Sequence, residues 1–158
     1  MRDSDISTRA LAMILGQKLK AKRMTIATAE SCTAGAIGAA IASVDGASAY
    51  YLGSVVTYAT RLKTELLKVD ATTIERYGVV SRETAVEMND GVKKLTGANV
   101  AISITGYAGA TGGDEFAENG TIWICVGEKS KKLMVDGDRT ENLQVAVEEA
   151  LKMAIENI

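Results

Sequence analysis

A serine and a cysteine stand side by side in TAESCTAG, residues 28–35, just after a short apolar run. A hydroxyl group at a strand-to-helix junction can attack a carbonyl carbon, because the amides of the following helix can stabilise the resulting oxyanion. Ser31 is therefore a candidate nucleophile, and Cys32 is the alternative. The competing interpretations are structural: Ser31 or Thr33 as helix N-cap, Cys32 as a buried thiol, and Glu30 as a helix-dipole partner rather than a base.

The sequence contains no histidine. This absence excludes Ser-His-Asp and Cys-His catalysis and removes the commonest metal ligand, and no sequence motif indicates a cofactor. A base for Ser31 must then be a carboxylate, a tyrosine, a water or a lysine that burial or nearby positive charge keeps neutral. Tyr58 and Lys63 are the candidates. Alternatively, Tyr58 is a half-buried strand residue and Lys63 a solvated helix lysine.

A glycine-rich segment follows the apolar run 99–106 and contains Gly106, Gly109, Gly112 and Gly113. Glycines permit the positive φ angles at which successive backbone amides form an anion-binding nest. A mobile surface loop is the alternative interpretation. Arg139, in the segment GDR, could bind a phosphate through two parallel hydrogen bonds, or could simply form a surface ion pair.

The alternation of apolar patterns predicts one α/β domain over residues 1–158, with a mixed sheet. Two helical faces stand out: Leu11, Ile14, Leu15 and Leu19 in the first segment, and Ala85, Met88, Val92 and Leu95 after a Ser81 cap. We expect strands over 24–30, 49–60 and 99–106 and a hairpin formed by 121–127 and 131–137; we expect helices over the first segment, 31–44, 61–69, 71–78, 81–97 and the C-terminal segment from Leu143.

The composition narrows the class of protein. The 18 basic and 20 acidic residues give a net charge of −2 with no long basic run, so nucleic acid is not an expected partner. No apolar run approaches the roughly 20 residues of a membrane span, and the first 23 residues do not read as a signal peptide. Two cysteines without an export signal favour free thiols. We therefore expect a cytoplasmic protein without membrane contact.

Several motifs, in this order, resemble those of the CinA C-terminal-domain family of competence/damage-inducible proteins. The resemblance covers about residues 8–156 and rests on AESCTAG, VVTYATRLKTELLKV, YGVVSRETAVEM, AISITGYAGATGG, GTIWICV and GDR. Enzymatic members of that family hydrolyse the amide of nicotinamide mononucleotide (NMN) to nicotinate mononucleotide and ammonia. The resemblance implies a three-layer α/β/α sandwich, a homodimer, a small-molecule nucleotide substrate and no metal.

The resemblance also assigns roles to individual residues. Ser31 of the ESCT motif becomes the nucleophile, and Tyr58 and Lys63 become a proton-transfer pair. The remaining assignments place residues at the substrate: Glu30, Cys32 and Thr33 beside the nucleophile, Thr105 and Gly106 of the ITG segment, and Gly109, Gly112 and Arg139 near the phosphate and ribose.

The chain departs from the family pattern at a few positions. Ala34 stands where the family usually has a second glycine, Ala110 stands where it has a proline, and Asn142 and Leu143 occupy the neighbourhood of another family arginine. The glycine loop also carries Asp114, Glu115 and Glu118. Two other functions therefore stay open: a nucleotide-binding module without turnover, and an amidase for a different pyridine nucleotide.

Overall fold

The computed structural model describes residues 3–158 and contains a five-stranded sheet with the strand order β2-β1-β3-β4-β5. The strands are β1 (Ile26–Glu30), β2 (Tyr51–Val56), β3 (Val100–Gly106), β4 (Thr121–Val126) and β5 (Lys129–Met134). β1 pairs in parallel with both β2 and β3, whereas β3 with β4 and β4 with β5 are antiparallel. The predicted mixed sheet is confirmed.

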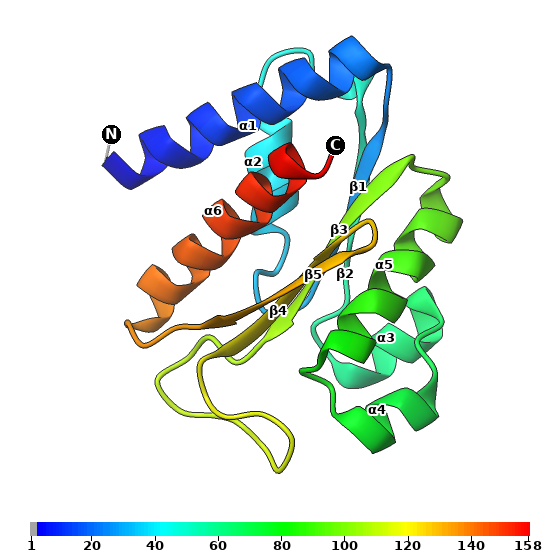
Figure 1. Ribbon diagram of the computed structural model, residues 1–158, viewed down its shortest axis with the longest axis vertical. Coiled ribbons are helices and arrows are strands. Elements are labelled where there is room, and N and C mark those ends of the chain that lie inside the picture. Colours follow the sequence, from blue (N-terminus) through cyan, green and yellow to red (C-terminus); the bar gives the residue numbers. More distant parts are fainter. Residues whose placement is uncertain (1–2) are drawn as a thin grey trace.

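Helices cover both faces of this sheet, so the predicted three-layer α/β/α sandwich is also confirmed (Figure 1). One face carries α1 (Asp3–Lys22), α2 (Ala36–Ala42) and α6 (Arg139–Glu156). The other face carries α3 (Thr60–Leu67), α4 (Ala71–Tyr77) and α5 (Arg82–Thr96), and a 3-10 turn over Ala47–Ala49 precedes β2.

Each face of the sheet has its own apolar core. Under α1, α2 and α6 the core includes Leu15, Leu19, Ile102 and Ile104, whereas the side of α3 and α5 contains smaller strand residues such as Ala101. β3 is apolar and buried on both faces, as expected of a central strand between two helical layers. Small side chains on the α5 side let that helix pack closely against the strands that carry the candidate site.

Several details of the predicted elements were wrong. Ile14 and Leu95 are exposed, because each lies at the edge of its helical stripe and faces solvent rather than the sheet. The strand predicted over 49–60 is shorter, because the 3-10 turn takes its first residues and its last residues leave the sheet to enter α3. The hairpin turns at 127–128, so β5 begins two residues earlier than predicted.

The helix predicted to begin at Ser31 begins at Ala36 instead, so neither Ser31 nor Thr33 is its N-cap. Residues 31–35 form a tight turn in which Ala34 has φ 50° and Gly35 has φ 96°. A left-handed backbone places the Cβ of an L-residue too close to the following carbonyl oxygen. This explains why glycine suits position 34, where this chain has alanine.

We expect Ala34→Gly to stabilise the protein by about 0.5–1 kcal/mol, because glycine relieves the left-handed strain. For a chain of this size that corresponds to a rise of roughly 1–4 °C in melting temperature, measured by calorimetry. Ala39→Gly is the matched control, since Ala39 is also exposed but lies within α2, where glycine should destabilise. A lower melting temperature for Ala34→Gly would contradict the prediction.

Within residues 3–158, no helix combines the length and the apolar content that crossing a membrane requires.

Candidate active site

The candidate residues gather where three parallel strands end. Ser31 directly follows β1, Tyr58 lies two residues after β2, and Thr105 and Gly106 close β3. The connection leaving β1 leads to β2 on one side and the connection leaving β3 leads to β4 on the other, so a crevice opens between these two strand ends. A cavity of about 320 Å³ lies there, lined by Ser31, Cys32, Tyr58, Thr60, Lys63, Val79, Val80, Thr105, Gly106, Tyr107, Ala108, Gly109, Thr111 and Arg139.

A buried lysine contacts the serine in this cavity. Lys63 Nζ lies 2.9 Å from Ser31 Oγ, although the two residues are 32 positions apart in the sequence. Lys63 is the fourth residue of α3, and only 1% of its surface is exposed. Burial disfavours the ammonium form and lowers the pKa of Lys63 from 10.5 to about 8. The solvated helix lysine of the alternative interpretation is therefore excluded.

Two backbone carbonyls orient the lysine amine. Lys63 Nζ donates to the carbonyl oxygen of Thr57 at 2.6 Å and to that of Tyr58 at 3.5 Å. A neutral amine has two N–H bonds and one lone pair. When both N–H bonds point at these carbonyls, the lone pair is left for the hydroxyl hydrogen of Ser31. The chain segment between β2 and α3 thus holds the amine beside the Ser31 hydroxyl.

Cys32 also lines the cavity but has the wrong protonation state for a nucleophile. Only 6% of the residue is exposed, and burial raises the pKa of its thiol from 9.0 to about 11. Since the thiolate is the reactive form of cysteine, the thiol is unreactive near neutral pH. Geometry and protonation both favour Ser31 over Cys32 as the nucleophile.

Glu30 is fully buried and serves as the missing cap of α2. Its carboxylate accepts hydrogen bonds from the backbone amides of Ile37 and Gly38 and from the hydroxyls of Thr28 and Thr33, at 2.6–3.0 Å. Neither Glu30 nor Thr33 lines the cavity, so the structure places both beneath the serine turn instead of at the expected substrate position. Glu30 thus has the structural role, as partner of the helix dipole rather than as a base, and it stabilises the start of α2.

This arrangement changes which amides can face an oxyanion. Glu30 already occupies the amides of Ile37 and Gly38 in the first turn of α2, and the Ser31 amide donates to the Ile104 carbonyl. Within residues 3–158, the amides of Cys32 and Thr33 donate to no other residue. The donors available next to Ser31 therefore belong to the turn, not to the helix.

Tyr58 contacts an arginine instead of the lysine amine. Arg139 Nη2 donates to the Tyr58 hydroxyl at 3.0 Å, and Tyr58 is 58% exposed at the rim of the cavity. Tyr58 and Lys63, the predicted proton-transfer pair, meet through the backbone carbonyl of Tyr58 and not through its hydroxyl. Arg139 is the first residue of α6, whose start is fixed by a capping box between Asp138 and Glu141.

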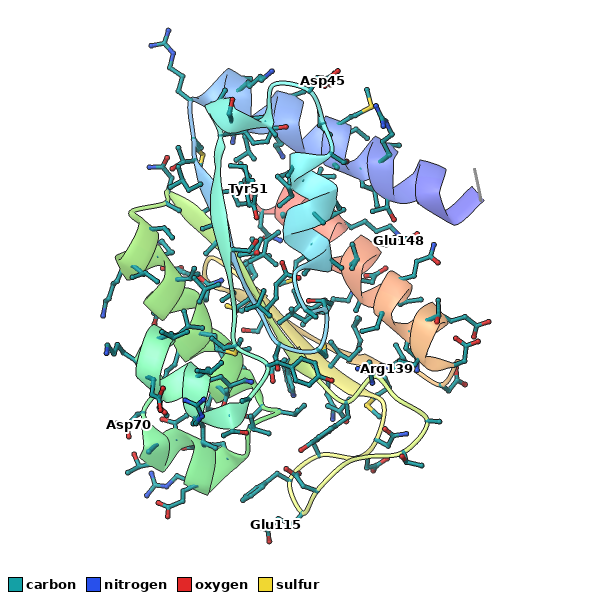
Figure 2. The ribbon with its side chains drawn as sticks, turned by 180° about the vertical axis from the view of Figure 1, so that it is seen from behind. Asp45, Tyr51, Asp70, Glu115, Arg139 and Glu148 are labelled. Carbon is teal, nitrogen blue, oxygen red and sulfur yellow. The ribbon has the colours of Figure 1, made fainter. Side chains whose placement is uncertain are left out.

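Hydrogen bonds within the glycine loop hold it in a defined turn at the surface. Tyr107 donates its hydroxyl to Asp114, which also accepts from the amides of Phe116 and Ala117. Figure 2 shows Glu115 at the outer tip of this loop, away from Arg139. Gly109 lines the cavity, but Gly112 does not, and no aspartate or glutamate lines it. Because the acidic residues of the loop lie outside the cavity, the charged side chains that line it are positive.

Several lining residues were missed from the sequence. Tyr107 follows Gly106, and Thr60 lies between Tyr58 and Lys63. Their closeness in the sequence to predicted site residues was the available signal. Val79 and Val80 lie in the motif YGVVSRETAVEM, but nothing in it marked them as lining residues, because they reach the cavity only through the packing of the segment between α4 and α5. The Thr105 hydroxyl holds that segment by donating to the Val79 carbonyl at 3.0 Å.

A larger hollow of about 570 Å³ lies beside the first, with Val80 at the boundary. Its lining includes Tyr77, Phe116, Trp123 and Lys132, but neither Ser31 nor Lys63. In the part of the chain that the structure describes, no three cysteine, aspartate or glutamate side chains gather where they could hold a metal ion. The cavity with the Ser31–Lys63 contact is thus the candidate active site.

Comparison with known proteins shows the family to which the chain belongs. The model of the CinA C-terminal domain matches residues 8–158. The chain is 45% identical over 139 residues to a CinA-like protein of Cytophaga hutchinsonii, covering 85% of this chain and 33% of that protein. It is 41% identical over 148 residues to a CinA-like protein of Salinibacter ruber, covering 91% and 36%. The chain thus spans about a third of the length of these curated relatives.

Solved structures of similar length also match. A competence-damaged protein (CinA) superfamily protein from Escherichia coli superimposes with a TM-score of 0.93 at 31% identity, covering 100% of this chain and 94% of that one. A competence or damage-inducible protein from Enterobacter asburiae gives a TM-score of 0.92 at 28% identity, covering 95% and 97%. The chain therefore belongs to the CinA C-terminal-domain family.

Proposed function

We propose that this protein is an amidohydrolase that converts NMN to nicotinate mononucleotide and ammonia. The observation that carries the proposal is the buried contact of 2.9 Å between Lys63 Nζ and Ser31 Oγ at the end of β1. A lysine whose pKa is lowered to about 8 can act as a general base near neutral pH. The pair thus supplies a nucleophile and its base in a chain that has no histidine.

In the first step, Ser31 Oγ attacks the carboxamide carbon of NMN while its proton passes to the neutral amine of Lys63. The carbonyl oxygen becomes an oxyanion, for which we assign the backbone amide of Cys32, a lining residue of the cavity, as the donor. Protonated Lys63 then gives its proton to the amide nitrogen, the C–N bond breaks, and ammonia leaves. The product of this step is an ester between Ser31 and the nicotinoyl group.

In the second step, water hydrolyses that ester. Lys63, neutral again, accepts a proton from the water as the water oxygen attacks the acyl carbon, and returns it to Ser31 Oγ when the ester bond breaks. The carboxylic acid and the free serine result, and the acid releases its remaining proton to solvent to give the carboxylate. The pyridinium ring of NMN withdraws electrons from the acyl carbon in both steps, which makes a lysine base sufficient.

The cavity supports a small anionic substrate. Its volume of about 320 Å³ falls within the range of small-molecule sites. Lys63 and Arg139 are its charged lining residues, and the Arg139 guanidinium stands at the rim, where it can bind a phosphate. We assign Tyr58 a role in substrate binding, because its exposed ring lies beside Arg139 at the cavity rim and can contact the sugar or the pyridinium. The homodimer that the family resemblance implies stays a prediction.

The test is ammonia release from a panel of NMN, nicotinamide riboside and a pyridine dinucleotide. We expect kcat/KM for NMN to exceed that for the riboside at least about tenfold, because a charge-assisted contact between Arg139 and phosphate contributes roughly 1.5–3 kcal/mol. Equal rates would contradict the role of Arg139. Faster release from the dinucleotide would favour a different pyridine nucleotide, and NMN binding in calorimetry without any product would favour a binding module.

A further inference from the structure

Asn142 is a buried polar residue next to the candidate site that the proposed mechanism does not use. It is the fourth residue of α6, three positions after Arg139, and only 3% of it is exposed. It lies in the neighbourhood where the family tends to have a second arginine. Its neighbour Leu143 packs against the apolar core. Neither residue lines the cavity, so any influence of Asn142 on a substrate must act through other groups.

The carboxamide of Asn142 joins the glycine loop, whose Ala108 lines the cavity, to the turn that precedes Arg139. Asn142 Nδ2 donates to the Ala108 carbonyl and to the Gly137 carbonyl, each at 2.9 Å. Asn142 Oδ1 accepts from the Gly137 amide, also at 2.9 Å. Both N–H groups and the oxygen of the side chain are thus engaged. Ala108 belongs to the glycine loop, and Gly137 belongs to the turn that leads into Arg139.

The two segments also meet at the cavity. A Cβ added at Gly109 would lie 3.2 Å from Arg139 Nη1, so the loop backbone passes directly beside the guanidinium group. The position of Arg139 relative to the loop therefore depends on what holds the loop against the start of α6. In addition to the van der Waals contact at Gly109, the Asn142 carboxamide supplies hydrogen bonds to both sides.

We propose that Asn142 is a positioning residue that fixes the glycine loop and Arg139 as one wall and so sets the affinity for the nucleotide phosphate. This inference rests on the proposed function for its substrate. Ser31 and Lys63 belong to other elements, the end of β1 and α3, so the chemistry itself does not pass through Asn142. Its loss is expected to weaken substrate binding and to leave the chemical step intact.

Asn142→Asp tests the proposal, because aspartate keeps the shape of the side chain but has no N–H groups for the two carbonyls. For NMN we expect KM to rise at least about tenfold, because a misplaced Arg139 loses its charge-assisted contact with the phosphate. We expect kcat to change less than about threefold. For nicotinamide riboside, which has no phosphate, KM should change less than about twofold. In an Arg139→Ala background, Asn142→Asp should add no further change in KM for NMN.

Asn89→Asp is the matched control. Asn89 is also buried, and its Nδ2 also donates to two carbonyls, of Ala101 and Cys125, but it does not line the cavity or touch its wall. We expect this variant to lower the melting temperature and to leave KM unchanged. If Asn142→Asp does not fold, Asn142→Ser, which keeps one donor, should give a smaller rise in KM for NMN.

The outcomes separate this inference from the proposed function. The inference alone would be overturned if the wild type hydrolyses NMN and both Asn142 variants keep its KM. It would also be overturned if Asn142→Asp raises KM equally for NMN and for the riboside, or if Asn89→Asp raises KM for NMN as much as Asn142→Asp does. If the wild type binds NMN without turnover, the proposed function is wrong, and the inference is tested by a weaker calorimetric affinity in Asn142→Asp. If the wild type neither binds nor hydrolyses NMN, both are wrong.

Discussion

Ser31→Ala is expected to lower kcat for NMN hydrolysis by about 10³-fold or more, because removing a nucleophile removes the covalent route altogether. The melting temperature should change little, since among residues 3–158 the side-chain hydrogen bond of Ser31 Oγ is the one to Lys63. Ammonia release at saturating NMN measures the effect. In the wild type, mass spectrometry of a rapidly quenched reaction should find a nicotinoyl ester on the peptide that contains Ser31.

Cys32→Ala is the matched control for this result. Cys32 adjoins Ser31 and lines the same cavity, but its raised pKa keeps the thiol protonated. We expect this variant to retain kcat within about fivefold, because only the backbone amide of residue 32 is needed for the oxyanion. Full activity of Ser31→Ala, or loss of activity in Cys32→Ala with Ser31 intact, would show that the nucleophile is assigned to the wrong residue.

Lys63→Met should lower kcat by roughly 10²–10⁴-fold, the usual contribution of a positioned general base. Methionine fills a similar volume without an amine. The change leaves the Thr57 carbonyl without its donor but also removes the cost of burying an ammonium group, so the melting temperature should move only by about a few degrees. Lys68→Met is the matched control, since Lys68 follows α3 but is exposed, and it should keep full activity.

The same lysine should set the pH profile. Lys63 acts as a base only when neutral, and its pKa is about 8, so log(kcat/KM) should rise with pH at a slope near one and level off above about pH 8. At pH 7 roughly a tenth of the amine is neutral. A profile that is flat between pH 6 and 9, or activity in Lys63→Met with the wild-type profile, would exclude Lys63 as the base.

Much of the fold followed from local patterns. The apolar run at 99–106 is long enough and sufficiently free of charge to predict a strand buried on both faces, and β3 is such a strand. The spacing of Ala85, Met88 and Val92 predicted the buried stripe of α5. The ends of these elements were less predictable, because in the turn over residues 31–35 the buried Glu30 carboxylate takes the first amides of α2 and the Ser31 amide donates to Ile104 of β3.

The sequence by itself determined which chemistry was available: without histidine, a serine needs a lysine or another unusual base, and the motif order indicated Ser31, Tyr58 and Lys63. Only the tertiary structure decided how these groups meet. Burial of Lys63 under the β2–α3 turn lowers its pKa, burial of Cys32 raises the pKa of the thiol, and Arg139 takes the Tyr58 hydroxyl. The physical reason is that protonation depends on desolvation and on partners far away in the chain, which a local pattern does not contain.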